Sequence, residues 1–267
     1  MIRLIFSDMD GTLLDDRGHL PAEFGQMYAR LRARGILFAP ASGRQYASLV
    51  ETFAPWKDEM IFLAENGTLV MEGGRELFAA PVDPALGLRV MQTGEALQGV
   101  YSVYCGKKQG YIHRVDDVPA FRAELEKYVT KSMVTENFAA VDDVPIKMAF
   151  FDPSGHADTT ILPVMEQYAD RMQVTLSSAL WVDVYAQGVS KGVAAARVQE
   201  HLGLTPDECA AFGDYGNDLE LMDAVTYSFA MANAIPAVQE RARYRAPSNG
   251  EHGVMAVCER ILAGEFD

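Results

Sequence analysis

The stretch that decides the fold is Ile2-Arg3-Leu4-Ile5-Phe6-Ser7-Asp8-Met9-Asp10-Gly11-Thr12, close to the N-terminus. Its first six residues form an apolar run that is typical of a buried strand. Residues i and i+2 of an extended chain point to the same side, so we expect Asp8 and Asp10 to face one pocket. Gly11 then allows a sharp backbone turn. Two carboxylates in one pocket repel each other, so the motif indicates a bound cation, acid/base chemistry, or both.

Strands and helices alternate on both sides of a longer middle segment. This alternation predicts an α/β fold, a Rossmann-like parallel sheet core covered by helices. The expected elements are helix 21–34, strand 36–39, a helix to about residue 53, strand 61–63, helix 191–202, strand 209–212, helix 218–224, strand 227–231, a helix after Pro236, a short segment at Tyr244 and a helix from about Gly253.

The middle segment has a different pattern, in which strands are paired and helices are fewer. We expect an α+β domain with an antiparallel sheet, inserted into the core as a lid. The chain then divides into a core of residues 1–81 and 187–267 and an inserted domain of residues 82–186. The expected elements of the insertion are strands 100–105, 111–115, near 133, 146–151, near 174 and 181–184, and helices 84–97, 119–129 and 157–168.

Composition and charge limit the classes of partner. The formal net charge of the 267 residues is −14, and such a surface repels phosphate backbones, so we expect no nucleic acid partner. No apolar run approaches the roughly 20 residues that cross a bilayer. Because the first strand begins at residue 2, we also expect no signal peptide. Cys105, Cys209 and Cys258 lack metal-ligand spacing, which favours free thiols and a cytoplasmic protein. No obligate protein partner is evident.

Polar groups also follow other expected strands, at the edge where parallel sheets bind ligands. Ser42-Gly43-Arg44 offers a hydroxyl and backbone N–H groups at the start of a helix, a ready anion site. Lys191 begins a later helix with a compact positive charge. Gly213-Asp214-Tyr215-Gly216-Asn217-Asp218 sets carboxylates on a glycine-rich turn, and such oxygen ligands suit Mg²⁺. Each motif alone fits an ordinary turn, helix cap or surface lysine, but together they predict one site.

The set of motifs resembles that of the haloacid dehalogenase-like hydrolases, and in particular the Cof-type sugar phosphatases with a large α+β cap of type IIB. Similar signature motifs are residues 8–12, Ser42-Gly43, Lys191, and Gly213-Asp214 with Asn217-Asp218. Residues 64–67 and 227–234 are also similar to the family, so the resemblance covers essentially the whole chain. One departure is His252, where many relatives carry Asp. The inserted domain is then expected to be a cap that sets substrate specificity.

The resemblance implies a Mg²⁺-dependent phosphatase, a phosphoric monoester hydrolase acting on sugar phosphates or similar small phosphorylated metabolites. Asp8 would be the nucleophile that forms a phosphoaspartate, and Asp10 the general acid/base. Mg²⁺ would be held by Asp8, the backbone carbonyl of Asp10, and Asp214. The substrate phosphate would be bound by Ser42, Gly43, Lys191 and Asn217. Asp218 would orient Lys191 or a metal-bound water.

Two other functions stay open at this point. A phosphomutase or phosphotransferase on the same core would share the phosphoaspartate but pass the phosphoryl group to a second hydroxyl. A non-catalytic protein that binds phosphorylated ligands would retain the scaffold alone. In the inserted domain, Lys147, Asp183 and Tyr185 lie on expected strands, where they either face the core or lie on the solvent side.

Overall fold

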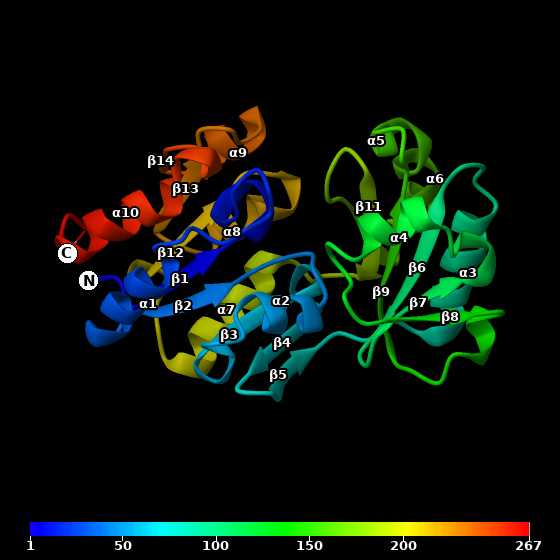
Figure 1. The fold of residues 1–267 in the computed structure, drawn as a ribbon, viewed down its shortest axis with the longest axis horizontal. Coiled ribbons are helices and arrows are strands. Elements are labelled where there is room, and N and C mark those ends of the chain that lie inside the picture. Colours follow the sequence, from blue (N-terminus) through cyan, green and yellow to red (C-terminus); the bar gives the residue numbers. More distant parts are fainter. Residues whose placement is uncertain (267) are drawn as a thin grey trace.

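A five-stranded parallel sheet with the order β14-β13-β12-β1-β2 forms the core of the molecule (Figure 1). The computed structural model describes residues 1–266, so residue 267 of the expected core range lies outside the described residues. Every neighbouring pair in this sheet is parallel, and the predicted α/β fold is confirmed. Its strands are β1 (Leu4–Ser7), β2 (Leu37–Pro40), β12 (Cys209–Gly213), β13 (Tyr227–Met231) and β14 (Tyr244–Ala246).

β1 lies inside this sheet, between β12 and β2, and its four residues are buried, as a strand covered on both faces requires. From β1 the chain moves outward to β2 in one direction, and from β12 to β13 and β14 in the other. Right-handed crossovers therefore place α1 and α8 on opposite faces, where α1 packs beside α10 and α8 beside α7. The core helices are α1 (Phe24–Ala33), α2 (Tyr46–Thr52), α7 (Lys191–Leu202), α8 (Leu219–Asp223), α9 (Pro236–Arg241) and α10 (Gly253–Leu262).

The strand expected at 61–63 does not continue the parallel sheet as a full member. It forms β3 (Ile61–Ala64) of an antiparallel sheet with β4 (Leu69–Glu72) and β5 (Arg75–Ala79), and touches the end of β2 by one parallel bridge between Ala41 and Leu63. The cause is the tight turn that follows it, where Glu65, Asn66 and Gly67 all have positive φ. This turn reverses the chain and points its polar residues toward the inserted domain.

The inserted domain is built on a six-stranded sheet with the order β10-β11-β9-β6-β7-β8. The sheet is antiparallel as expected, except that β7 and β8 pair in parallel. The helix expected over 157–168 is broken into two short pieces, and Pro163 near the break removes a backbone donor. The strands are β6 (Tyr101–Gly106), β7 (Gly110–His113), β8 (Ser132–Thr135), β9 (Pro145–Phe151), β10 (Met172–Leu176) and β11 (Trp181–Ala186), and the helices are α3 (Pro84–Glu95), α4 (Pro119–Leu125), α5 (Ala157–Thr160) and α6 (Leu162–Met165).

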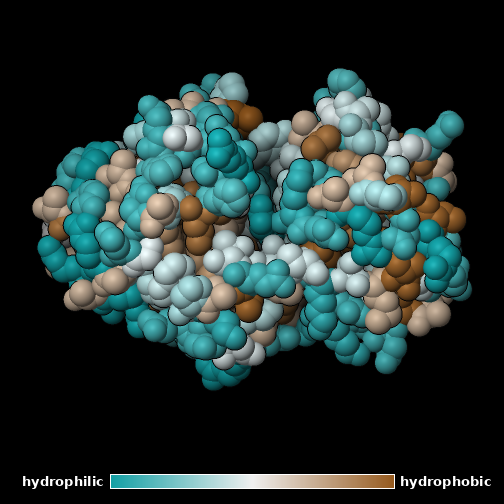
Figure 2. All heavy atoms as spheres, viewed as in Figure 1, coloured by the Kyte–Doolittle hydropathy of each residue, from teal (hydrophilic) through white to brown (hydrophobic). Residues whose placement is uncertain are grey.

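The two sheets form separate lobes, joined by the segments between β5 and α3 and between β11 and α7 (Figure 1). The space-filling view shows a groove between the lobes (Figure 2). None of the helices within residues 1–266 is long and apolar enough to span a membrane. The domain limits at residues 82 and 186 stay a prediction, which limited proteolysis would test.

Candidate active site

The predicted motifs meet at the carboxyl ends of neighbouring strands. Asp8 directly follows β1, Ser42 lies just beyond β2, and Asp214 directly follows β12. Because β12, β1 and β2 are adjacent in the sheet, these residues share one edge, the usual ligand-binding edge of open α/β sheets. Lys191, the first residue of α7, contacts the same place. The topology thus assembles one site from distant parts of the chain.

The turn after β1 makes room for Asp214. Gly11 has a φ of 76°, a conformation that favours glycine. A Cβ atom at this position would lie 2.3 Å from Asp214 Oδ2, far inside van der Waals contact. The next residue, Thr12, donates a hydrogen bond from Oγ1 to Asp214 Oδ1 at 3.0 Å. The first motif therefore both clears the space for this carboxylate and orients it.

Lys191 is fully buried between two carboxylates. Its Nζ donates to Asp8 Oδ1 at 2.5 Å and to Asp218 Oδ1 at 2.7 Å. Burial alone would lower the pKa of Lys191, but Asp218 and Asp8 raise it above its ordinary value. Burial raises the pKa of Asp8 well above its ordinary value, and the nearby carboxylates add to this effect while Lys191 opposes it. One ammonium group therefore does not compensate the negative charge around Asp8.

Asp8, Asp214 and Asp218 form a buried cluster, each with a carboxylate oxygen within 4.8 Å of the others. Burial, followed by repulsion from Asp218, raises the pKa of Asp214 to about 7. Besides Lys191, Asp218 accepts hydrogen bonds from the backbone N–H groups of Asp214 and Tyr215 at 3.0 and 3.2 Å. Asp218 thus serves to orient its neighbours, whereas Asp8 and Asp214 keep oxygens for a ligand. Uncompensated charge on hard oxygen donors fits a divalent cation.

Asp10 and Arg44 form a bidentate ion pair. Arg44 Nε donates to Asp10 Oδ2 at 2.8 Å, and Nη2 donates to Oδ1 at 2.6 Å. The backbone N–H of Arg44 donates to Ser42 Oγ at 3.1 Å, so the second motif is ordered by its own hydroxyl. The guanidinium also lies over the ring of Tyr128 in the inserted domain, 5.4 Å from the ring centre. The sequence analysis gave Arg44 no role, because nothing in the motif indicates which carboxylate it would pair with.

Asn66 joins the fourth motif to the inserted domain. Its Oδ1 accepts a hydrogen bond from Asn217 Nδ2 at 3.0 Å, and its Nδ2 donates to Asp183 Oδ2 at 2.7 Å. Asn66 has a φ of 58°, and asparagine tolerates this left-handed conformation better than most residues do. Asn217, expected at the substrate phosphate, is therefore held by a side chain from the turn after β3.

Lys147 on β9 and Asp183 on β11 face the core, which decides between the two placements left open for them. They are only 4% and 3% exposed, and Tyr185 is also buried. Lys147 Nζ donates to the backbone carbonyl of Gly43 at 2.7 Å and lies 2.7 Å from Glu65 Oε2. The alternation along each strand was compatible with either face, so sequence alone did not settle this contact.

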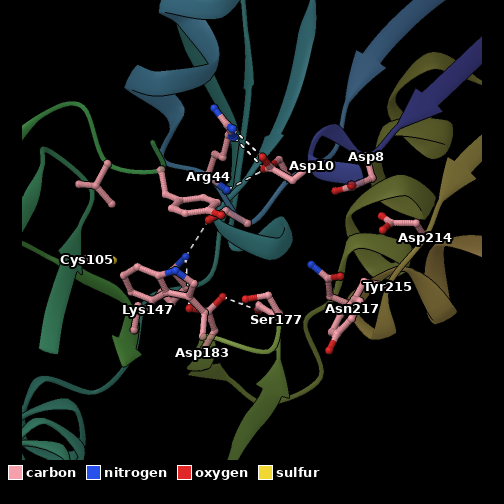
Figure 3. Close-up of a pocket in the computed structure, with 17 residues that line it drawn as sticks. Asp8, Asp10, Arg44, Cys105, Lys147, Ser177, Asp183, Asp214, Tyr215 and Asn217 are labelled. Atoms are coloured by element: carbon pink, nitrogen blue, oxygen red, sulfur yellow. Dashed lines mark hydrogen bonds and ion pairs between the residues drawn. The ribbon is translucent and has the colours of Figure 1, made fainter. Parts of the chain in front are cut away.

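These groups surround one cavity between the lobes, in which Asp8, Asp10 and Asp214 lie on one side and Lys147 and Asp183 on the other (Figure 3). The space between these side chains is open to solvent and is lined by residues of both lobes. The predicted site residues that line it are Asp8, Asp10, Ser42, Gly43, Asp214 and Asn217.

Three residues singled out in the sequence are not at the cavity surface. Lys191 and Asp218 lie behind it, with no exposed surface, in contact with Asp8 and with each other. His252 lies at the start of α10, where its Nδ1 is 2.6 Å from Glu23 Oε1. The departure from the family pattern at this position therefore leaves the cavity wall unchanged.

Comparisons with known proteins agree with this geometry. The family model described as haloacid dehalogenase-like hydrolase matches residues 5–257. The chain is 32% identical over 271 residues to the 5-amino-6-(5-phospho-D-ribitylamino)uracil phosphatase YbjI of Escherichia coli (strain K12), covering 99% of this chain and 97% of that protein. It is 29% identical over 241 residues to an HMP-PP phosphatase of Citrobacter koseri, covering 88% of this chain and 86% of that protein.

The fold has similar solved structures as well. The structure of SMU.1108c from Streptococcus mutans UA159 matches with a TM-score of 0.90 at 26% identity, covering 98% of this chain and 100% of that one. Both the parallel core sheet and the α+β insertion are therefore shared along the whole length. The chain belongs to the haloacid dehalogenase-like hydrolases, as a phosphatase of phosphoric monoesters with an inserted α+β domain.

Proposed function

We propose that this phosphatase is Mg²⁺-dependent and hydrolyses small phosphomonoesters, sugar phosphates among them, through a phosphoaspartate on Asp8. The observation that carries the proposal is the set of contacts around Asp8. Lys191 donates to one of its oxygens at 2.5 Å, and Asp214 and Asp218 complete a carboxylate cluster beside it. A nucleophilic carboxylate needs a cationic neighbour, here Lys191, to stay ionised when it is buried.

The residues present fit a divalent cation. Asp8, the backbone carbonyl of Asp10, and Asp214 would hold it, and Gly11 leaves the space that a Cβ would otherwise fill. When bound, Mg²⁺ would neutralise the repulsion between carboxylate and phosphate and support the charge that develops during transfer.

The chain's own groups supply the remaining chemistry. An oxygen of Asp8 attacks phosphorus, and the bond from phosphorus to the leaving oxygen breaks as Asp10 gives its proton to that oxygen. Asp10 then takes a proton from the water that attacks the phosphoaspartate, which releases phosphate and regenerates Asp8. Ser42, the Gly43 N–H and Asn217 line the cavity and would hold the phosphoryl oxygens. Lys191, buried behind them, would support the phosphoryl group through its contact with Asp8, so that positioning and electrostatics provide most of the rate enhancement.

The position of the cavity supports a small metabolite as substrate. Its walls come from both core and cap, so a bound phosphomonoester would lie between the two domains. The E. coli relative is named for a phosphorylated ribitylaminouracil, and a polyol phosphate of that kind is a candidate here. We also place the enzyme in the cytoplasm, which its free, buried cysteines support.

A phosphate-release assay tests the proposal. The purified chain is incubated with p-nitrophenyl phosphate and a panel of sugar and polyol phosphates, with Mg²⁺ and with a chelator. We expect Mg²⁺-dependent release that Asp8→Asn abolishes and that the exposed cap variant Asp142→Asn retains. More than about 1% residual activity in Asp8→Asn would overturn the nucleophile assignment. Isomer formation without free phosphate would indicate a phosphotransferase instead.

A further inference from the structure

The cap contributes a polar wall to the cavity that the reaction does not use. It lies opposite the catalytic carboxylates (Figure 3). This wall decides what the leaving group of a bound phosphomonoester contacts, because the phosphoryl group itself is directed to Asp8. Its residues, referred to below as the cap wall, are Tyr128, Lys147, Ser177, Ser178, Trp181 and Asp183.

Lys147 is the one cation of the cap wall, and it is already paired with carboxylates. An ammonium group has three donors. Nζ of Lys147 donates to the Gly43 carbonyl at 2.7 Å, and it pairs with Glu65 Oε2 at 2.7 Å and with Asp183 Oδ1 at 3.6 Å. Lys147, Glu65 and Asp183 are all buried, and this cluster contains two carboxyl groups and one ammonium group. The lysine therefore offers no unpaired positive charge to the cavity.

The other cations near the cavity are also paired with carboxylates. Arg44 is paired with both oxygens of Asp10, and Lys191 lies between Asp8 and Asp218. Within the part of the chain that the structure describes, every Lys or Arg that lines the cavity has a carboxylate partner. A second anionic group on a ligand would thus meet the carboxylate of Asp183 and no unpaired cation. Like charges brought together away from water are strongly unfavourable.

Two atoms of the cap wall instead suit an uncharged polar group. Asp183 Oδ2 accepts from Asn66 Nδ2 at 2.7 Å and from Ser177 Oγ at 2.6 Å. Asp183 Oδ1 lies 3.6 Å from Lys147 Nζ, too far for a hydrogen bond, and can accept from a ligand. Trp181 is 7% exposed, and its indole Nε1 has no hydrogen-bond partner among residues 1–266. Buried donors are normally satisfied, so this N–H points to a ligand acceptor. Hydroxyl groups both donate and accept, so a leaving group with several of them can donate to Asp183 and accept from Trp181.

We propose that the cap wall selects phosphomonoesters whose leaving group is uncharged and rich in hydroxyl or amide groups, and that it rejects leaving groups bearing a carboxylate or a second phosphate. Asp183 is the specificity-determining residue: its free oxygen accepts from the leaving group, and its charge repels anions. This inference rests on the proposed phosphatase activity and adds the chemical class of the substrate.

The test compares two substrates that differ at one carbon. Sorbitol 6-phosphate and 6-phosphogluconate have the same chain and hydroxyl configuration, but the first ends in CH₂OH and the second in a carboxylate. We expect kcat/KM to favour sorbitol 6-phosphate by at least about thirtyfold, as the repulsion of like charges predicts. Equal use of the two substrates, or a preference for 6-phosphogluconate, would overturn the inference.

Variants then assign the effect to the cap wall. Asp183→Asn should reduce the preference to below about fivefold, by slowing sorbitol 6-phosphate and speeding 6-phosphogluconate. Asp142→Asn makes the same change of charge at an exposed position of the cap and should leave the preference intact. If both variants keep the wild-type ratio, Asp183 does not determine specificity. A thermal melt checks that each variant is folded.

Trp181→Phe provides a second test that does not depend on the stability of Asp183→Asn. It keeps an aromatic ring but removes the N–H, so KM for sorbitol 6-phosphate should rise about tenfold while p-nitrophenyl phosphate turnover stays near wild type. An unchanged KM contradicts a ligand role for this N–H. If the wild-type protein does not hydrolyse p-nitrophenyl phosphate, the proposed function is wrong. If it hydrolyses p-nitrophenyl phosphate but not sorbitol 6-phosphate, only the inference on specificity is wrong.

Discussion

Arg44 holds both carboxylate oxygens of Asp10, at 2.8 and 2.6 Å, and at the same time lies over the ring of Tyr128 in the cap. Arg44 is only 10% exposed in its side chain, whereas Asp10 is 41% exposed. The better-buried partner therefore fixes the position of the more exposed one. Since Arg44 also touches the cap, the placement of Asp10 is linked to cap closure.

Arg44→Met should therefore impair protonation of the leaving group more than the attack on phosphorus. We expect kcat for an alkyl phosphate such as sorbitol 6-phosphate to fall about tenfold to a hundredfold, because general acid catalysis contributes at least this much. Turnover of p-nitrophenyl phosphate, whose leaving group departs without a proton, should fall less than about threefold. Steady-state kinetics on both substrates measures the difference.

Arg30→Met is the matched control, because Arg30 forms its ion pair with Glu259 on the exposed surface. It should leave both kcat values unchanged. An equal loss on the two substrates in Arg44→Met would show that Arg44 binds substrate and does not position Asp10.

Gly11→Ala should weaken metal binding, because its Cβ would lie 2.3 Å from Asp214 Oδ2. The left-handed φ of 76° adds a stability cost of about 1 kcal/mol. We expect the Mg²⁺ concentration that gives half-maximal activity to rise more than about tenfold, consistent with displacement of one metal ligand. A Mg²⁺ titration of activity and a urea unfolding curve measure the two effects.

Gly35→Ala separates the effect on metal binding from the effect on stability. Gly35 has a similar φ of 73°, but a Cβ there meets nothing within 4 Å. It should lose only the stability that the left-handed φ costs, and it should keep the wild-type Mg²⁺ dependence. If Gly35→Ala also lost metal affinity, the clash with Asp214 would not be the cause.

The metal-free protein should become less stable as the pH rises from about 4 to 7. Asp214 has a pKa of about 7 in the fold, raised from 3.8 mainly by burial. Over this range the folded state holds a proton that the unfolded state has released, so raising the pH favours unfolding, by up to about 4 kcal/mol in the limit. Thermal melts in chelator from pH 4.5 to 8, compared with Asp214→Asn, isolate this contribution.

Saturating Mg²⁺ should reverse the trend, because the cation replaces the proton and stabilises the folded state to which it binds. The difference in melting temperature with and without Mg²⁺ should therefore grow as the pH rises toward 8. A stabilisation by Mg²⁺ that does not depend on pH would contradict the assignment of Asp214.

Lys147→Met should destabilise the protein by about 3–5 kcal/mol, because it leaves Glu65 and Asp183 buried without their cation. Lys107→Met is a close control: Lys107 also joins cap to core, through Glu76 at 2.8 Å, but this pair is partly exposed. It should cost less than about 1 kcal/mol. Urea unfolding of both variants provides the comparison, and similar losses would show that burial of the Lys147 pair is unimportant.

Much of the fold was predictable because hydrophobic spacing is a local property. The helix expected over 191–202 and the strand over 227–231 have those bounds in the structure. Asn66-Gly67 predicts the hairpin turn that follows the strand at 61–63, and this turn is present between β3 and β4. The strand was expected in the parallel sheet, but the turn pairs it with β4 and leaves one parallel bridge to the core. The parallel pairing of β7 and β8 was likewise missed, since pairing direction depends on how the chain returns and not on the strand's own residues.

Some residues of the site were predictable from the sequence, and others were not. Residues placed directly after buried strands, such as Asp8 and Asp214, were identified because parallel strands present their ends at one edge. Arg44, Asn66 and Lys147 were quoted without a role, since a polar residue in a motif or on a strand does not reveal its partner. Their partners lie 34 to 151 positions away along the chain.

The sequence by itself determined the α/β core and the convergence of Asp8, Lys191 and Asp214 on one edge, because apolar periodicity and strand order require only local patterns. The tertiary structure alone decided how the cap closes the site. It pairs Lys147 with Glu65, sets Asp183 beside Asn66 and leaves Trp181 Nε1 free. These contacts depend on which face of each cap strand meets the core, and that is fixed by the packing of two domains rather than by any one segment.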